Sequence, residues 1–235
     1  MTTSKILTEL QSLGRESYKK VMLNHGVEEP IFGVKIEELK KIVKREKPNH
    51  SLALELYATG NYDAMYLAGL LADDSQMSQQ DLQHWVENTK GTAIAGVIVP
   101  WVAAGSSHGW EMGLRWIDSA SPTIAGAGWA TLASVLSVVS NDRLDMKKLH
   151  QLMKRVETTI HKTPDFPRYQ MNFFLIACGG YVPELTALAK ETGHKIGKVT
   201  ANLGNNACSI PSIVDYIAKM EQRGNIGKKK KTAKC

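Results

Sequence analysis

Hydrophobic residues recur along almost the whole chain at the spacing that places them on one face of an α-helix. The first such stripes lie between Ile6 and Leu13 and between Val34 and Val43. Asn61 and Ser78 stand where helix-capping residues are expected, and Asp81 follows Ser78 at the spacing of a capping box. The same period predicts further helices over residues 93–104, 108–119, 122–139, 145–160, 167–180, 182–194 and 211–223.

Short connectors separate these expected helices, and few stretches alternate with the period of a β-strand. The exception is Lys198–Cys208, which is loop-like and could pair weakly. Many short helices without convincing strands indicate stacked antiparallel pairs, in HEAT-type units of about 30–45 residues. Each pair leaves an apolar face that its neighbour must cover. The expected fold is therefore all-α, a curved superhelical solenoid whose inner helices line a concave surface.

The basic residues are concentrated in one early helical segment, Lys35–Lys47, and at the end of the chain. The formal net charge is +6, and Lys228–Lys234 holds five lysines and no acid. The last residues, GNIGKKKKTAKC, have too little apolar content to pack, which predicts a mobile tail. We therefore expect one helical repeat domain over residues 1–223 and a basic tail over residues 224–235. Binding of phosphates and simple solubilisation both explain such a tail.

All five tryptophans lie within residues 85–129, and a run without any charged side chain extends from Gly91 to Trp110. The run is about long enough to cross a bilayer, but Pro100 and a Gly-Ser-Ser-His turn interrupt it, which favours a buried helix and a turn. The N-terminal residues lack the apolar segment of a signal peptide, and the three cysteines are far apart. We expect a cytoplasmic monomer without a membrane span, metal ion or cofactor.

Several residues in this aromatic stretch have both a packing and a binding interpretation. Trp101 and Trp116 stand among aliphatic residues at helical spacing, which favours the core. Trp129 follows Gly126 and Gly128, and it is the best candidate for a tryptophan that faces a groove. Two glycines inside a helical pattern are costly, which indicates close approach of a neighbouring helix or of a ligand backbone.

Polar residues elsewhere offer little chemistry for catalysis. The segment Arg168–Asn172 begins an otherwise apolar helix, and a helix N-terminus with such residues suits a phosphate as well as ordinary capping. Asp73 and Asp74 end a helical stripe, which favours a solvated turn over a pair for acid–base work. No nucleophile triad, phosphate-binding glycine loop or metal-ligand spacing occurs in the sequence.

Segments spread over most of the chain resemble the DNA alkylation repair family of HEAT-like repeat DNA glycosylases. They are FGVKIEELKKIVKREK, LYATGNYDAMYLAGLLADD, the step Trp116–Ser119, RYQMNFFLIACGGYV and the closing GNIGKKKKTAKC. The resemblance implies a curved helical solenoid that binds duplex DNA in its concave face. Active members release N3- and N7-alkylated purines without a metal ion. Because such a base is cationic and leaves readily, a carboxylate and a few aromatic and arginine side chains suffice to catalyse cleavage of its glycosidic bond.

The resemblance also implies which catalytic residues this chain has lost. Active members carry a W-W-D-x-x-D pattern before I-V-P, and here the second aromatic position falls on Thr92 and the essential acid on Gly96. The family arginine falls on Gly126, and a later aromatic falls near Ile176. The expected subgroup therefore lacks the usual catalytic residues, and we assign no catalytic residue to it. With Trp129, these positions are expected to line the groove.

We expect a DNA-binding protein that recognises the backbone of duplex or branched DNA through a concave basic groove and lacks standard glycosylase activity. The residues expected to bind nucleic acid are Lys35, Lys40, Lys41, Lys44, Arg168, Lys195, Lys198, Lys228, Lys229, Lys230 and Lys231. One alternative is an active metal-free alkylpurine glycosylase in which Glu111 or Asp118 supplies the acid. Another is a non-enzymatic scaffold that binds a protein, which an acidic or apolar inner face would favour.

Overall fold

The computed structural model describes residues 1–202 and 209–234, and this part contains helices and no strand. The all-α expectation is confirmed. The expected loop Lys198–Cys208 is irregular up to residue 202, and its remainder lies outside the described residues. The helices are α1 Thr3–Leu13, α2 Glu16–Asn24, α3 Ile36–Glu46, α4 His50–Ala58, α5 Tyr62–Leu71, η1 Asp74–Gln76, α6 Gln79–Glu87, α7 Gly91–Ala93, η2 Ile94–Ile98, α8 Val99–Gly105, α9 Gly109–Trp116, α10 Pro122–Val138, η3 Asn141–Arg143, α11 Met146–Thr159, η4 Ile160–Lys162, α12 Asp165–Tyr181, η5 Pro183–Leu185, α13 Thr186–Ile196 and α14 Ile213–Gln222.

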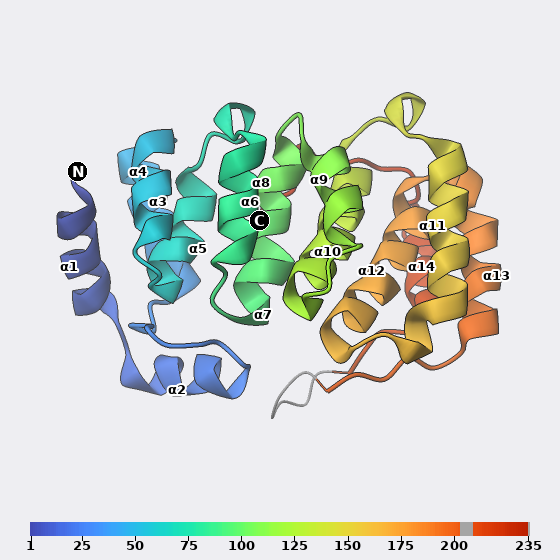
Figure 1. Ribbon diagram of the computed structural model, residues 1–235, viewed down its shortest axis with the longest axis horizontal. Coiled ribbons are helices and arrows are strands. Elements are labelled where there is room, and N and C mark those ends of the chain that lie inside the picture. Colours follow the sequence, from blue (N-terminus) through green and yellow to red (C-terminus); the bar gives the residue numbers. More distant parts are fainter. Residues whose placement is uncertain (203–208, 235) are drawn as a thin grey trace.

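The helices are stacked in two layers along the long axis of the molecule (Figure 1). The inner layer consists of α5, α8, α10, α12 and α14, each in contact with the next. The outer layer contains α4, α6, α9, α11 and α13, which pack against the inner layer as antiparallel partners. The result is a curved stack of antiparallel helix pairs, as the hydrophobic period predicts.

Local capping explains where several helices begin. The Asn61 side chain accepts a hydrogen bond from the Ala64 amide at 3.1 Å, and Ser78 and Asp81 form a reciprocal capping box. Both caps are expected from the sequence.

The helix α2 is not expected from the sequence. None of its residues is buried, so it has no row of apolar residues at helical spacing by which it could be predicted. It crosses the end of the neighbouring helices (Figure 1).

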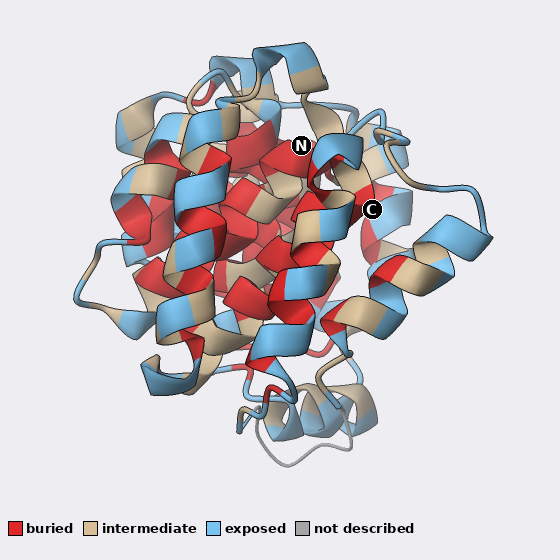
Figure 2. Ribbon diagram, turned by 90° about the vertical axis from the view of Figure 1, so that its right-hand side faces the viewer, coloured by how far each residue is buried: buried red, intermediate tan, exposed pale blue. Residues whose placement is uncertain are grey.

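The core lies between the two layers. Buried residues fill the space between the helices, while exposed residues cover their outer sides (Figure 2). Trp85 and Trp116 are each 1% exposed, and the Trp85 ring stacks on that of Tyr57 with centroids 4.0 Å apart. Burial of large aromatic side chains contributes much of the hydrophobic stabilisation of such a stack.

The charge-free segment forms one continuous helix over Gly91–Gly105, with a π-helical turn at Ile94–Ile98, and a turn then leads into α9. Pro100 explains this turn, since proline lacks the amide that would bond to Gly96 and its ring would clash with that carbonyl. The helix is largely buried inside the stack. Among the described residues, no single helix is long and apolar enough to cross a membrane. The helical segments Asp165–Tyr181 and Pro183–Ile196 have the required length and composition only when they are taken together, and the chain bends by 116° between them.

Candidate nucleic-acid interface

A cleft of about 290 Å³ opens on the side of the inner layer that faces away from α9. Gly128 and Leu132 of α10 contact Ile117 and Gly113, so that face of α10 is directed at α9. Ala133 is on a different face and lines the cleft. We call this depression the inner cleft; it is lined by Gly96, Trp101, Ala130, Ala133, Ser134, Ser137, Gln170, Phe173, Ile176, Ala177, Tyr181, Tyr216, Met220, Lys230 and Ala233.

The inner cleft is nearly uncharged. None of the described residues that line it is an aspartate or a glutamate, and Lys230 is its one basic residue. Aromatic side chains occupy much of its wall. Trp101 packs edge-on against Tyr66 with centroids 6.1 Å apart, and Tyr216 is 43% exposed. Such a surface suits the flat faces of nucleobases better than it suits acid–base chemistry.

Two glycines on neighbouring helices face the same phenylalanine ring. An added Cβ atom at Gly96 would lie 2.6 Å from Nε2 of Gln170 and 3.2 Å from Cε2 of Phe166. An added Cβ atom at Gly126 would overlap Cδ1 and Cε1 of the same Phe166 ring. Phe166 and Gln170, both from α12, therefore fill the space that side chains at these two positions would need.

The last described residues form a strap, residues 224–234, that lies along the C-terminal ends of the inner helices. The Gly227 amide donates to the Gly180 carbonyl at 2.9 Å, and the Lys230 amide donates to Ser137 at 2.8 Å. Ala233 is only 6% exposed. The sequence predicts a mobile tail, whereas the structure places this segment against the body, since its backbone and lysines find partners there that apolar content alone does not reveal.

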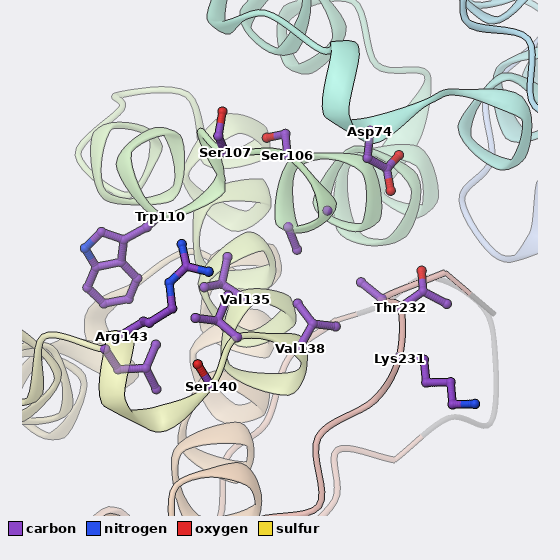
Figure 3. A pocket seen from close by; sticks show the side chains of 15 residues that line it. Asp74, Ser106, Ser107, Trp110, Val135, Val138, Ser140, Arg143, Lys231 and Thr232 are labelled. Carbon is purple, nitrogen blue, oxygen red and sulfur yellow. The ribbon is translucent and has the colours of Figure 1, made fainter.

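A second, larger cavity of about 700 Å³ lies on the other side of the strap. Figure 3 shows Asp74 and Thr232 on one side of it and Trp110 and Arg143 on the other. Trp110 is half-buried, as expected for a residue after a turn. The Arg143 guanidinium makes no hydrogen bond or ion pair within the described part of the chain. Sequence reasoning misses Arg143, because it stands in a short turn without any motif.

A family model described as DNA alkylation repair enzyme matches residues 6–195. The chain belongs to the DNA alkylation repair enzyme family. Both the family resemblance and the HEAT-like repeat fold expected from the sequence are thereby confirmed.

Full-length relatives of this family member exist in Listeria. The uncharacterized protein Lin0241 of Listeria innocua is 29% identical over 232 residues, which cover 96% of this chain and 100% of that protein. The uncharacterized protein Lmo0209 of Listeria monocytogenes is 30% identical over 230 residues, which cover 95% of this chain and 99% of that protein.

A solved structure superposes on the whole chain with a TM-score of 0.91, at 32% identity and with 100% of both chains covered. That structure is described as a new family of proteins related to the HEAT-like repeat DNA glycosylases with affinity for branched DNA structures. It supports the assignment of this DNA alkylation repair family member to the HEAT-like repeat fold.

The positions that match the family's catalytic pattern are only partly brought together. Gly96 and Ile176 line the inner cleft, and Gly126 lies beside it against Phe166. Thr92 is exposed near the start of α7 and does not line the cleft. Trp129 is 1% exposed and packs against Phe174, with centroids 5.1 Å apart. The groove expectation for Trp129 is corrected, because its face of α10 is directed into the core.

Arg168 is engaged inside the protein. Its guanidinium donates to the Thr163 carbonyl at 2.9 and 2.7 Å and to the Thr200 carbonyl at 2.7 Å. It also pairs with Asp165 at 3.1 Å. The expected phosphate cradle is corrected accordingly: Arg168 ties the first turn of α12 to the segment around Thr200, and its donors are committed there.

Lys229 is engaged as well, because its ammonium donates to the Leu136 carbonyl at 2.7 Å. The remaining basic residues expected to bind nucleic acid lie at the surface. Lys41 pairs with Glu38 at 2.8 Å, and Lys195 pairs with Glu191 at 2.7 Å. Such exposed pairs are weak, and a phosphate can compete for the ammonium group. Lys35 is 3.6 Å from Glu37. Within the described residues no ion pair involves the exposed lysines Lys40, Lys44 and Lys198.

The two acids considered for altered glycosylase chemistry are remote from the inner cleft. Glu111 lies on α9 and accepts a hydrogen bond from Gln79 at 2.9 Å. Asp118 pairs with Arg155 at 2.6 Å and is 69% exposed. Neither residue lines the cleft. Within the described residues, no group of three or more His, Cys, Asp or Glu side chains could hold a metal ion.

Proposed function

We propose that this protein binds DNA through its inner face and does not excise alkylated bases by the standard chemistry of its family. Membership of the DNA alkylation repair enzyme family supports a role on DNA. The affinity for branched DNA described for the full-length structural relative, at 32% identity, supports branched DNA as the ligand. A net charge of +6 favours association with a polyanion.

The observation that carries the second half of the proposal is the filled space between Gly96 and Gly126. Cleavage of a glycosidic bond develops positive charge on the sugar, which a nearby carboxylate stabilises. No described residue of the inner cleft supplies one, and Phe166 and Gln170 close the position where one would stand. The cleft instead offers neutral aromatic surface, which suits unstacked bases at a branch point.

Lysines around the inner face would supply the backbone contacts. Lys40 and Lys44 are one helical turn apart on α3 and exposed on the same side. Lys195 and Lys198 lie near the end of α13, close to the opposite end of the stack (Figure 1). Neutralisation of phosphates by such lysines releases counterions, so the affinity is expected to fall steeply with salt.

A mobility-shift titration tests the proposal. A four-way junction and a linear duplex of the same sequence are compared at several salt concentrations. We expect tighter binding of the junction, and the variant K40A/K44A should reduce the salt slope by about 2, or about 1 for each phosphate contact. Lys147, exposed on the outer helix α11, is the matched control. The absence of binding at low salt would end the proposal.

The neutral character of the inner cleft favours a second candidate, a scaffold that binds another protein. Its aromatic and small side chains resemble the apolar centre of a protein interface, and Tyr216 is exposed there. The same titration separates the two candidates. A chain that binds neither DNA at low salt would be assigned to this second class.

A further inference from the structure

The strap at residues 224–234 is hydrogen-bonded to the C-terminal ends of three inner helices, α5, α10 and α12. Its backbone amides bond to carbonyls in the last turns of α12 and α10, through Gly227 and Lys230. The Lys229 ammonium donates to the Leu136 carbonyl at 2.7 Å, and the Lys234 ammonium donates to Ala72 at 2.7 Å. Carbonyl groups at a helix C-terminus lack partners within the helix and attract cations. The strap therefore satisfies acceptors that would otherwise lack a protein donor.

Asp74 anchors the far end of the strap. Its Oδ1 atom is 2.7 Å from the Lys234 ammonium, and the side chains of this pair are 17% and 16% exposed. Asp74 also lies directly against Gly105, where any Cβ atom would overlap the carboxylate. Burial raises the pKa of Asp74, and the neighbouring Lys234 opposes that rise. The ion pair thus joins residues far apart in sequence, and Ala233 packs beside it among Ala104 and Val135.

The docked strap leaves other lysines free to face a ligand. Lys228, Lys230 and Lys231 are exposed. The Lys230 ammonium lies 5.9 Å from the centroid of the Tyr181 ring in the inner cleft. Lys231 and Arg143 line the cavity on the other side of the strap (Figure 3). Anchoring lysines and ligand-facing lysines are therefore distinct residues of the same short segment.

We propose that Asp74 and Lys234 are positioning residues that hold the strap as a folded part of the DNA interface, with Lys230, Lys231 and Arg143 binding the phosphates of one strand. This inference rests on the proposed function. A fixed array of cations binds a strand without the entropy cost of ordering a mobile tail. Loss of the anchor should therefore weaken binding although every phosphate-binding lysine remains.

Amide hydrogen exchange measures docking of the strap without any DNA. In the full chain, the amides of Gly227 and Lys230 should be protected, and D74N and K234M should each remove that protection while the helical circular dichroism is unchanged. Two anchor variants are used because one of them alone could perturb the local turn. Exchange of both wild-type amides at unprotected rates would overturn the inference.

Junction binding then tests the role of the docked strap. We expect D74N and K234M to lower the affinity about tenfold with an unchanged salt slope, whereas K230A/K231A lowers the slope by about 2. The control K147A should change neither. If the wild type binds the junction and the undocked anchor variants bind it with an affinity within twofold of the wild type, this inference fails while the proposed function stands. If the wild type binds no DNA, the proposed function fails and the inference with it.

Discussion

The ring of Phe166 lies against Gly126 so closely that a single added methyl group on the glycine would overlap it. The ring belongs to α12 and the glycine to α10, so the contact fixes how these two inner helices approach. The same ring reaches Gly96 in the π-helical turn that leads into α8. One phenylalanine therefore occupies the space next to both positions that the family resemblance matches to an acid and an arginine.

Substitution of Gly126 by alanine tests this packing. Replacing a helical glycine by alanine ordinarily stabilises a helix by about 1 kcal/mol. Here we expect G126A to lower the free energy of unfolding, because overpacking against Phe166 costs about 1–3 kcal/mol. In an F166A background the overlap is absent, and the same substitution should be neutral or stabilising. Urea unfolding of the four proteins gives the coupling energy. A stabilised G126A single variant would contradict the packing described.

Arg168 is expected to contribute to stability and not to phosphate binding. Its guanidinium is committed to the carbonyls of Thr163 and Thr200. R168A should lower the free energy of unfolding by about 1–3 kcal/mol, since hydrogen bonds from a charged donor are lost. The salt slope of junction binding should stay at the wild-type value. A slope reduced by about 1 without any loss of stability would restore Arg168 to the phosphate-binding set.

Asp63 holds the segment that leads into α3. Its carboxylate accepts hydrogen bonds from the amides of Phe32, Gly33 and Val34 at 2.6, 3.1 and 2.9 Å, and the residue is 1% exposed. D63A would leave these amides without an acceptor, so we expect a loss of several kcal/mol, at about 1–3 kcal/mol for each buried group. D63N retains one oxygen and should lose less. Thermal unfolding of both variants checks the order, and equal stability of D63A and wild type would refute this role.

Substitution of Tyr216 distinguishes the contribution of base stacking to DNA binding from the contribution of charge. Its side chain is 43% exposed, so truncation should change stability little. We expect Y216A to weaken junction binding by about 1–3 kcal/mol, the range for one stacked base, without a change in the salt slope. Y216F keeps the ring and should bind as the wild type does. If Y216A binds the junction with wild-type affinity, bases do not stack at this position.

The hydrophobic period was sufficient to predict the architecture because every helix of a two-layer stack must bury a stripe. The expected helix over residues 122–139 is α10 at Pro122–Val138, and the capping roles of Asn61 and Ser78 are confirmed. The helix α2 escaped prediction for the opposite reason: it buries no residue completely and has no stripe. Periodicity therefore detects helices that pack on two sides and misses those that lie across an end.

The candidate site was predictable only in part. Matching the family pattern located Gly96 and Gly126, but a one-dimensional match could not show that Phe166 fills the space next to both. The contacts of polar side chains were harder still to predict from the sequence. Asp74 looked like part of a solvated turn, and its partner Lys234 is at the other end of the chain. Long-range ion pairs leave no local signal, so the docked strap could not be inferred from composition.

Base release under conditions of saturated binding tests whether this protein binds branched DNA without excising an alkylated base. The protein is held in excess over a branched DNA that carries one N7-methylguanine, so that nearly all of the DNA is bound, and the free base is quantified over time. We expect a bound complex with no release above a heat-killed control. Release of the methylated base from the bound complex would contradict it, because the inner cleft would then hold a catalytic group that its described residues do not provide.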